Sequence, residues 1–447
     1  MKLWQIQSDI NKTIEQFTIG QDQVMDLELA YYDVIGSMAH AKMLLEIGIL
    51  QPAEHIKLHK GLVNILNDVL AGNFVIKEGV EDVHSQVELI LTDTLDQVGK
   101  KIHSGRSRND QVLLDLKLYM RDQIHEIVRL VEPLFNQLIS LSNRYQHVLL
   151  PGYTHFQVAM PSSFGLWFGA YAESLSDDLR FLKAAFYMIN RNPLGSAAGY
   201  GSSFPLKRQI TTDLLGFDSM NFNVVYAQMG RGKAEKSLAM AMVHFADTLG
   251  RMAYDICLYM SQNFSFLSFP DEYTTGSSIM PHKKNPDVFE IIRARCNKIK
   301  CQVNDINLVT SNLPSGYHRD MQLLKQGLFD SIESLKECLY MTSFMLEKVV
   351  INENILDEKK YDLIFSVELV NELVLQGKSF RDAYLEVGKL IKEGRYKPDK
   401  NINHTHEGSI GQLCNNQIEE YMSDTINFFM SKFADIDSSV DQLIKNT

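Results

Sequence analysis

The sequence predicts an all-α fold with three helical domains, the second of which is a long central helix bundle. Two observations predict it. Through the middle of the chain, apolar residues recur at alternating steps of three and four, which is the repeat of long, nearly parallel helices. Alternating β patterns are almost absent. The 447 residues also allow two or three domains, each with its own core.

The first long helix is expected between residues 111 and 142. Its apolar positions keep the helical period throughout, and they are Leu113, Leu116, Met120, Ile124, Ile127, Val131, Leu134, Leu138 and Leu141. Pro133 interrupts this stretch. Since proline lacks the backbone N–H and clashes with the preceding turn, we expect a kink or a break there.

Four more helices are expected in the same region. Two runs cover 175–189 and 238–259, a third begins after Pro286, and a fourth begins after Tyr317. The run at 238–259 is rich in methionine, and we interpret it as core packing rather than as a ligand face. Together with the first, five long helices in one region predict a bundle.

The domain boundaries expected from this pattern are 1–105 for an N-terminal helical domain, 106–352 for the bundle and 353–447 for a C-terminal helical domain. No internal repeat and no low-complexity tract is present.

The bulk composition restricts the kinds of partner. The formal net charge is -11, which argues against a broad nucleic-acid surface. The five cysteines show no C-x-x-C spacing and predict reduced thiols, hence a cytoplasmic protein. We expect no signal peptide in the first 17 residues and no membrane span. His404 and His406 lack a nearby third ligand, so a polar turn is favoured over a metal site.

Four segments combine cations with uncharged hydrogen-bond donors. They read "SGRSRND" (104–110), "GYTHFQ" (152–157), "GSSIMPHKKNP" (276–286) and "GYHRDMQLLK" (316–325). In an acidic protein, such agreement predicts a site for a small substrate with several carboxylates. In the third segment, Asn285 is expected to cap a helix that begins at Pro286.

The third segment resembles the G-S-S-x-M-P-x-K-x-N-P loop of the fumarase/aspartase superfamily. Within that superfamily, "HSGRSRNDQV", "GYTHFQ" and "DVIGSMAHAKML" (33–44) resemble the argininosuccinate lyases. The resemblance covers most of the chain except its last hundred residues. It implies an all-helical homotetramer whose active sites each take loops from three subunits. It also implies a small-molecule substrate, no cofactor and no metal.

The implied reaction is the reversible β-elimination of argininosuccinate to arginine and fumarate. By resemblance, Ser277 is the general base, and His155 is the second catalytic group. Lys283 would support the Ser277 alkoxide and, with Asn285, hold the carboxylate that takes up the carbanion charge.

The remaining assignments concern substrate binding. The resemblance implies that the fumarate half is bound by Ser107, Arg108, Asn109 and Thr154. The arginine half or its carboxylate would be bound by Tyr317, Gln322 and Lys325, and Asp26 belongs to the region that meets its amino-acid end.

Several positions depart from the family's pattern. The residues around Asp26 are Asp22 and Glu28 where a serine and an arginine are usual, and His282 replaces a usual glutamine. After His155 the usual Gln-Arg-Ala-Gln-Pro reads "QVAMP" (157–161). Because the first changes touch the amino-acid end of the arginine half, an N-acylated substrate is one hypothesis.

Two further alternatives remain open at this point. A sister enzyme such as adenylosuccinate lyase can carry a similar Met-Pro-His-Lys loop, although "SGRSRND" argues against it. A catalytically inactive structural homologue, as in lens crystallins, would keep the fold without the reaction.

Overall fold

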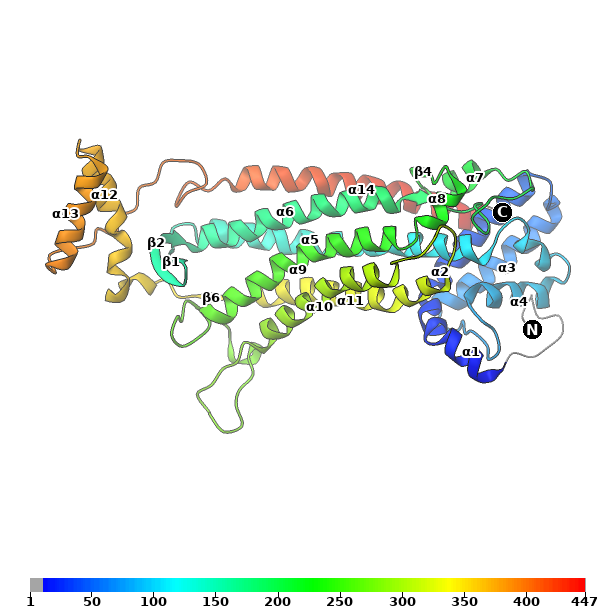
Figure 1. Cartoon of the computed structure of the whole chain (residues 1–447), viewed down its shortest axis with the longest axis horizontal. Helices are drawn as coiled ribbons and strands as arrows, with labels where there is room; N and C mark the ends of the chain where they lie inside the picture. The colour runs from blue at the N-terminus through cyan, green and yellow to red at the C-terminus, as the bar shows by residue number, and fades with distance from the viewer. Residues whose placement is uncertain (1–10, 447) are drawn as a thin grey trace.

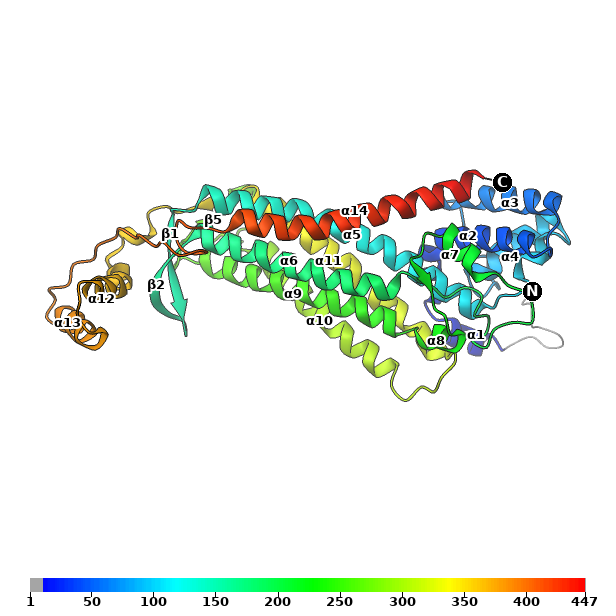
Figure 2. The same cartoon turned by 90° about the horizontal axis from the view of Figure 1, so that it is seen from above.

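The molecule is elongated, with a helix bundle along its long axis and a group of helices at each end (Figures 1 and 2). The computed structural model describes residues 11–446. Any expectation for residues 1–10, including the start of the first domain and most of the signal-peptide assessment, lies outside the described residues.

Within residues 11–446, helices account for nearly all regular structure. The α-helices are α1 (Lys12–Ile19), α2 (Asp22–Glu46), α3 (Pro52–Leu70), α4 (Val83–Leu95), α5 (Arg108–Arg144), α6 (Phe164–Ile189), α7 (Arg208–Leu214), α8 (Val224–Met229), α9 (Lys233–Tyr259), α10 (Asp287–Val309), α11 (Leu324–Leu346), α12 (Ser366–Leu375), α13 (Phe380–Lys392) and α14 (Asn415–Lys445). The 3₁₀ helices are η1 (Gly99–His103), η2 (Asp271–Tyr273), η3 (Arg319–Leu323), η4 (Ile355–Asp357) and η5 (Lys359–Phe365).

The strands are short and pair only in twos. They are β1 (Leu149–Thr154) with β2 (Gln157–Ser163), β3 (Arg191–Asn192) with β4 (Ser219–Met220), and β5 (Leu267–Ser268) with β6 (Val350–Ile351). The all-α prediction is therefore confirmed. Among the helices of residues 11–446, none has the length and hydropathy of a membrane span.

The bundle consists of the five helices that the apolar periodicity predicted: α5, α6, α9, α10 and α11. Neighbouring helices pack along their lengths, α10 against α9 and α11, and α6 against α5 and α9. One core cluster of buried apolar side chains runs through them. The periodicity identified these helices because each must bury one stripe against its neighbours.

Helix α5 does not break at Pro133, so that alternative is wrong. It continues to Arg144, with Val131, Leu134 and Leu138 fully buried on either side of the proline. Burying these side chains in the bundle core outweighs the lost backbone hydrogen bond, which costs about 3 kcal/mol.

The N-terminal helices form a second cluster around α2, α3 and α4. Leu114 and Leu118 of α5 belong to this cluster, so the first turns of α5 join the N-terminal helices to the bundle. Gly36 of α2 makes this approach possible, since a Cβ there would lie 2.6 Å from Leu114 Cδ2.

Residues 353–446 lie in two different places. Helices α12 and α13 form a small cluster of their own around Val370, Ala383 and Val387, beyond one end of the bundle (Figure 1). Helix α14 instead runs back along the bundle and packs on α5 and α6 (Figure 2). The domain boundaries themselves stay predictions.

Candidate active site

A polar cavity of about 180 Å³ lies where the N-terminal helices meet the bundle. It takes residues from the starts of α2, α4 and α5, from the loop before α9 and from the segment that leads into α11. The lining residues are Ile19, Asp22, Asp26, Glu81, Asp82, His84, Arg108, Asn109, Val112, Arg231, Tyr317, Arg319, Gln322 and Lys325. Six of the predicted substrate-binding residues are among them.

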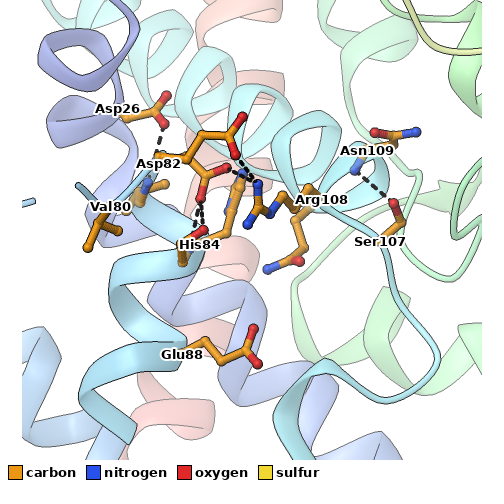
Figure 3. A network of polar contacts seen from close by, with 12 residues as sticks. Asp26, Val80, Asp82, His84, Glu88, Ser107, Arg108 and Asn109 are labelled. Carbon is orange, nitrogen blue, oxygen red and sulfur yellow. Dashed lines mark hydrogen bonds and ion pairs between the residues drawn. The ribbon is translucent and has the colours of Figure 1, made fainter. Parts of the chain in front are cut away.

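The N-terminus of α5 forms one wall (Figure 3). Ser107 caps this helix: its Oγ accepts from the Asn109 backbone N–H at 3.3 Å, and its own N–H donates to Asp110 at 2.8 Å. Arg108 and Asn109 follow and line the cavity. A helix N-terminus with an arginine in its first turn favours the binding of a carboxylate group.

The Arg108 guanidinium is also paired within the chain. Its Nη1 lies 2.8 Å from Glu81 Oε2 and 3.3 Å from Asp82 Oδ2. Burial disfavours the charge on Asp82, but His84, Arg108 and hydrogen bonds from Ser85 outweigh it and lower the pKa of Asp82. These two carboxylates hold Arg108 at the cavity wall.

Lys325 lines the same cavity. Its side chain is 3% exposed, and its Nζ lies 2.6 Å from Asp26 Oδ1 and also pairs with Asp22. Asp26 Oδ2 accepts from the Val83 backbone N–H at 3.3 Å. Burial raises the pKa of Asp22, and the Lys325 charge opposes this rise. The N-terminal helix α2 and the bundle helix α11 thus meet in a buried charge cluster.

The other residues predicted to bind the arginine half, Gln322 and Tyr317, line the same cavity as Lys325. The Gln322 side-chain amide donates to the carbonyls of Thr18 and Ile19, at 3.0 Å each. Tyr317 lies beneath Arg231, whose guanidinium carbon is 5.8 Å from the ring centre. Arg231 is buried, and its Nη1 has no hydrogen-bond partner among the described residues.

His84 lines the cavity and lies between two buried carboxylates. Its Nδ1 lies 2.8 Å from Asp33 Oδ1 and 3.5 Å from Asp115 Oδ2. Burial disfavours the imidazolium, but Asp33, Asp115 and Asp82 outweigh it and raise the pKa of His84 to about 9. The same three residues have the spacing of a cation site. The His84 imidazolium already supplies one positive charge there, and burial and the nearby Asp33 raise the pKa of Asp115.

Thr154 and His155 lie elsewhere, at the tip of a hairpin. The register pairs Thr154 with Gln157, which leaves His155 and Phe156 as a two-residue turn. Both have positive φ, 54° and 57°, as a type I′ hairpin turn requires. His155 is exposed and is not part of the core. A non-glycine residue in this conformation is costly and often marks a functional site.

Ser277 lies on the loop before α10. Its Oγ is the acceptor for the backbone N–H groups of Ile279, at 3.4 Å, and Met280, at 3.2 Å. Two backbone donors that converge on one hydroxyl oxygen stabilise negative charge there.

Lys283 and Asn285 lie on the same loop. The Lys283 side chain is exposed, and no carboxylate of the described residues pairs with it, whereas Lys284 pairs with Asp271. Asn285 does not cap α10, which begins at Asp287 with Pro286 at the cap position. It closes the loop instead: its N–H donates to the Thr275 carbonyl at 2.8 Å.

Within one chain, the hairpin with His155 and the loop with Ser277 both lie far from the cavity. Figure 1 shows the β1–β2 hairpin and the N-terminal helices at opposite ends of the long axis, and the loop before α10 projects from the bundle on the hairpin's side. The cavity therefore gathers the substrate-binding residues of α5 and α11, but neither Ser277 nor His155.

The comparisons with known proteins identify the family. The sequence matches the family described as Lyase over residues 2–300. It is 59% identical to the argininosuccinate lyase of Bacteroides thetaiotaomicron over 96% of both chains. The chain belongs to the argininosuccinate lyase family. The chain is also 60% identical to the argininosuccinate lyase of Parabacteroides distasonis over 96% of both chains. It is 37% identical to that of Thermotoga neapolitana, over 89% of this chain and 99% of the relative.

Solved structures of other lyases share the fold. An EDDS lyase in complex with formate superposes with a TM-score of 0.80 at 20% identity, covering 98% of this chain and 95% of its own. A class II fumarase from Schistosoma mansoni gives a TM-score of 0.70 at 16% identity, covering 92% and 94%. Membership of the argininosuccinate lyase family makes the sister-lyase alternative wrong.

Sequence reasoning missed several cavity residues. Glu81, Asp82, His84 and Arg231 were not singled out, although they line the same cavity as Arg108. The segment "EDVHS" (81–85) offered a weak signal, because aspartate is a preferred residue at a helix N-cap. Nothing in its spacing connects it with Arg108 or Lys325.

Proposed function

We propose that this member of the argininosuccinate lyase family catalyses the reversible β-elimination of argininosuccinate to arginine and fumarate. The observation that carries the proposal is the near-full-length identity of 59–60% to argininosuccinate lyases. The geometry of the candidate residues supports it at each step below.

The first step removes a proton from the carbon next to a carboxylate. Ser277 is the proposed base. A serine hydroxyl is a weak base in water, but the N–H groups of Ile279 and Met280 already point at its Oγ. They lower the cost of the alkoxide, and the ammonium of Lys283 on the same loop adds to this effect.

The resulting carbanion spreads into the neighbouring carboxylate, which becomes doubly negative. Lys283 and Asn285 are the proposed donors to this group. Hydrogen-bond donors lower the activation barrier when they bind the doubly negative intermediate more strongly than they bind the substrate. His155, exposed at the hairpin tip, is proposed to protonate the departing guanidino group, directly or through water.

The cavity is proposed to bind the two ends of the substrate. Arg108 and Asn109 at the N-terminus of α5, with Ser107 and with Thr154 from the hairpin, would take the fumarate carboxylates. Tyr317, Gln322 and Lys325, with Asp26, would take the amino-acid end of the arginine half. The proposed steps use protein groups alone, without metal or organic cofactor.

A homotetramer belongs to the same proposal. The hairpin that carries His155 and the loop that carries Ser277 lie away from the N-terminal helices in Figure 1, so neither residue reaches a substrate in the cavity of its own chain. Antiparallel packing of the bundles of neighbouring subunits would bring the hairpin and the loop of other chains to each cavity. A cytoplasmic location, expected from the unpaired cysteines, is likewise proposed.

The test is a fumarate assay. Purified protein with argininosuccinate should raise the ultraviolet absorbance of fumarate, and the Ser277→Ala variant should lower kcat by about 10³-fold or more. Its helical circular dichroism should not change, because Ser277 lies on a loop. A wild type without any fumarate release would favour the inactive structural homologue, and full activity of Ser277→Ala would disprove the base.

A further inference from the structure

Glu81 lies between two arginines that line the cavity. Arg108 Nη1 donates to its Oε2 at 2.8 Å, and Arg319 Nη2 donates to its Oε1 at 3.2 Å. Arg108 is the first residue of α5 and Arg319 the first residue of η3, so the two guanidinium groups come from distant parts of the chain. One carboxylate therefore joins the N-terminus of α5 to the segment that leads into α11.

Arg319 extends this contact to Gln322. Its Nε donates to Gln322 Oε1 at 3.3 Å. The amide nitrogen of the same glutamine donates to the carbonyls of Thr18 and Ile19, at 3.0 Å each. Both ends of the Gln322 amide are thus held, and its orientation depends on where the Arg319 guanidinium lies.

The neighbouring carboxylate of Asp82 has a narrower set of partners. Its Oδ2 lies 3.3 Å from Arg108 Nη1, and its Oδ1 accepts from the backbone N–H of Ser85 at 2.8 Å, which caps α4. Among residues 11–446, the ion pairs of Asp82 do not include Arg319. Both carboxylates hold Arg108, but only Glu81 also holds Arg319.

The bridge through Glu81 is better suited to orienting side chains than to stabilising the fold. Arg319 is half-exposed, and water screens an ion pair with such a partner. An arginine side chain that is already held in place, however, loses less rotamer freedom when a ligand binds to it or beside it. The Glu81 carboxylate lowers this cost for two guanidinium groups at once.

We propose that Glu81 is a positioning residue for both halves of the substrate, holding Arg108 directly and Gln322 through Arg319. The inference rests on the proposed function, in which Arg108 takes the fumarate end and Gln322 takes the arginine half. Glu81 is negative, so it suits the cations around the substrate rather than the substrate's carboxylates. A single side chain that orients donors at both ends also fixes their separation, which a substrate containing both halves must match.

The experiment measures KM for fumarate and for arginine separately, in the reverse reaction. Glu81→Gln keeps the size of the side chain and removes its charge, so both KM values should rise by about 3- to 10-fold, with a smaller effect on kcat. Asp82→Asn should raise KM for fumarate alone, since asparagine still caps α4. Arg319→Met should raise KM for arginine alone.

Two further comparisons separate positioning from a general structural role. On KM for arginine, Glu81→Gln and Arg319→Met should not be additive, because both variants break the same contact. Glu126→Gln, which removes an exposed carboxylate that pairs with Arg129 on α5, is the matched control and should keep wild-type values. Thermal unfolding should give nearly the same Tm for all of these variants.

Several results would overturn the inference. Glu81→Gln might raise KM for fumarate alone, as Asp82→Asn should, or leave both KM values unchanged. Additive effects of Glu81→Gln and Arg319→Met on KM for arginine would also contradict it. If Glu81→Gln does not fold, an unchanged KM for arginine in Arg319→Met overturns the inference by itself. No turnover by the wild type in either direction would instead refute the proposed function.

Discussion

The Nζ of Lys325 lies 2.6 Å from Oδ1 of Asp26, although 299 residues separate them in the sequence. This ion pair joins the first turn of α11 to α2, and it forms one wall of the cavity. It therefore ties the N-terminal helices to the bundle at the position where the substrate is proposed to bind.

Replacing one member of this pair should destabilise the protein strongly. Lys325→Met leaves Asp22 and Asp26 facing each other in a buried site, and we expect a loss of about 3–5 kcal/mol in the free energy of unfolding. Urea unfolding followed by circular dichroism measures it. The double variant Asp26→Asn/Lys325→Met should recover part of the loss. Lys284→Met, which removes an exposed ion pair, should have little effect, and a similar loss there would contradict the account.

The hairpin offers a way to separate conformation from chemistry at His155. Asparagine tolerates positive φ well, so His155→Asn should keep the turn and the stability. It removes the proton donor, and we expect kcat to fall by about 10²- to 10⁴-fold. Steady-state kinetics and thermal unfolding are the measurements. An unchanged kcat with an unchanged Tm would show that His155 has no catalytic role.

Replacing Arg108 should weaken the binding of one half of the substrate more than that of the other. In the reverse reaction, Arg108→Met should raise KM for fumarate by about 10- to 100-fold and change KM for arginine much less, because Arg108 faces the proposed fumarate end. Arg129→Met, an exposed position on the same helix, is the control. Equal effects on both reactants would argue against the assigned orientation.

The charge on His84 should make stability depend on pH. Because Asp33 and Asp115 raise its pKa above the unfolded value near 6.5 to about 9, its stabilising contribution is complete below pH 6.5. The contribution should fall as pH rises from 6.5 to 9. Urea unfolding of wild type and His84→Gln should show a difference in unfolding free energy that shrinks over this range. A constant or growing difference would contradict a charged His84.

The bundle was predictable because its helices bury one periodic apolar stripe each. The same signal was present in α14, where Met422, Ile426, Phe429, Phe433 and Ile436 recur at steps of four and three and are buried. A bundle helix was therefore identifiable there as well. Its place beside α5 and α6 was not, since it is reached only after α12 and α13 and their connecting loops.

The candidate site was only partly predictable. Local sequence can identify residues that share one helix start or one turn. Arg108 and Asn109 are examples of the first, and His155 is an example of the second. The pairing of Arg108 with Glu81 and Asp82 depends on how α4 meets α5, which no local pattern encodes. Sequence spacing also cannot show that Ser277 and His155 lie away from the cavity of their own chain.

The central claim is that each active site combines residues of different subunits, and mixing inactive variants tests it most directly. Ser277→Ala and His155→Asn are purified separately, unfolded and refolded together, and fumarate release is measured. If the two residues of one site come from different chains of a tetramer, random mixing should restore about a quarter of the wild-type activity. If they come from the same chain, no mixed site is complete, and the mixture should stay as inactive as its components.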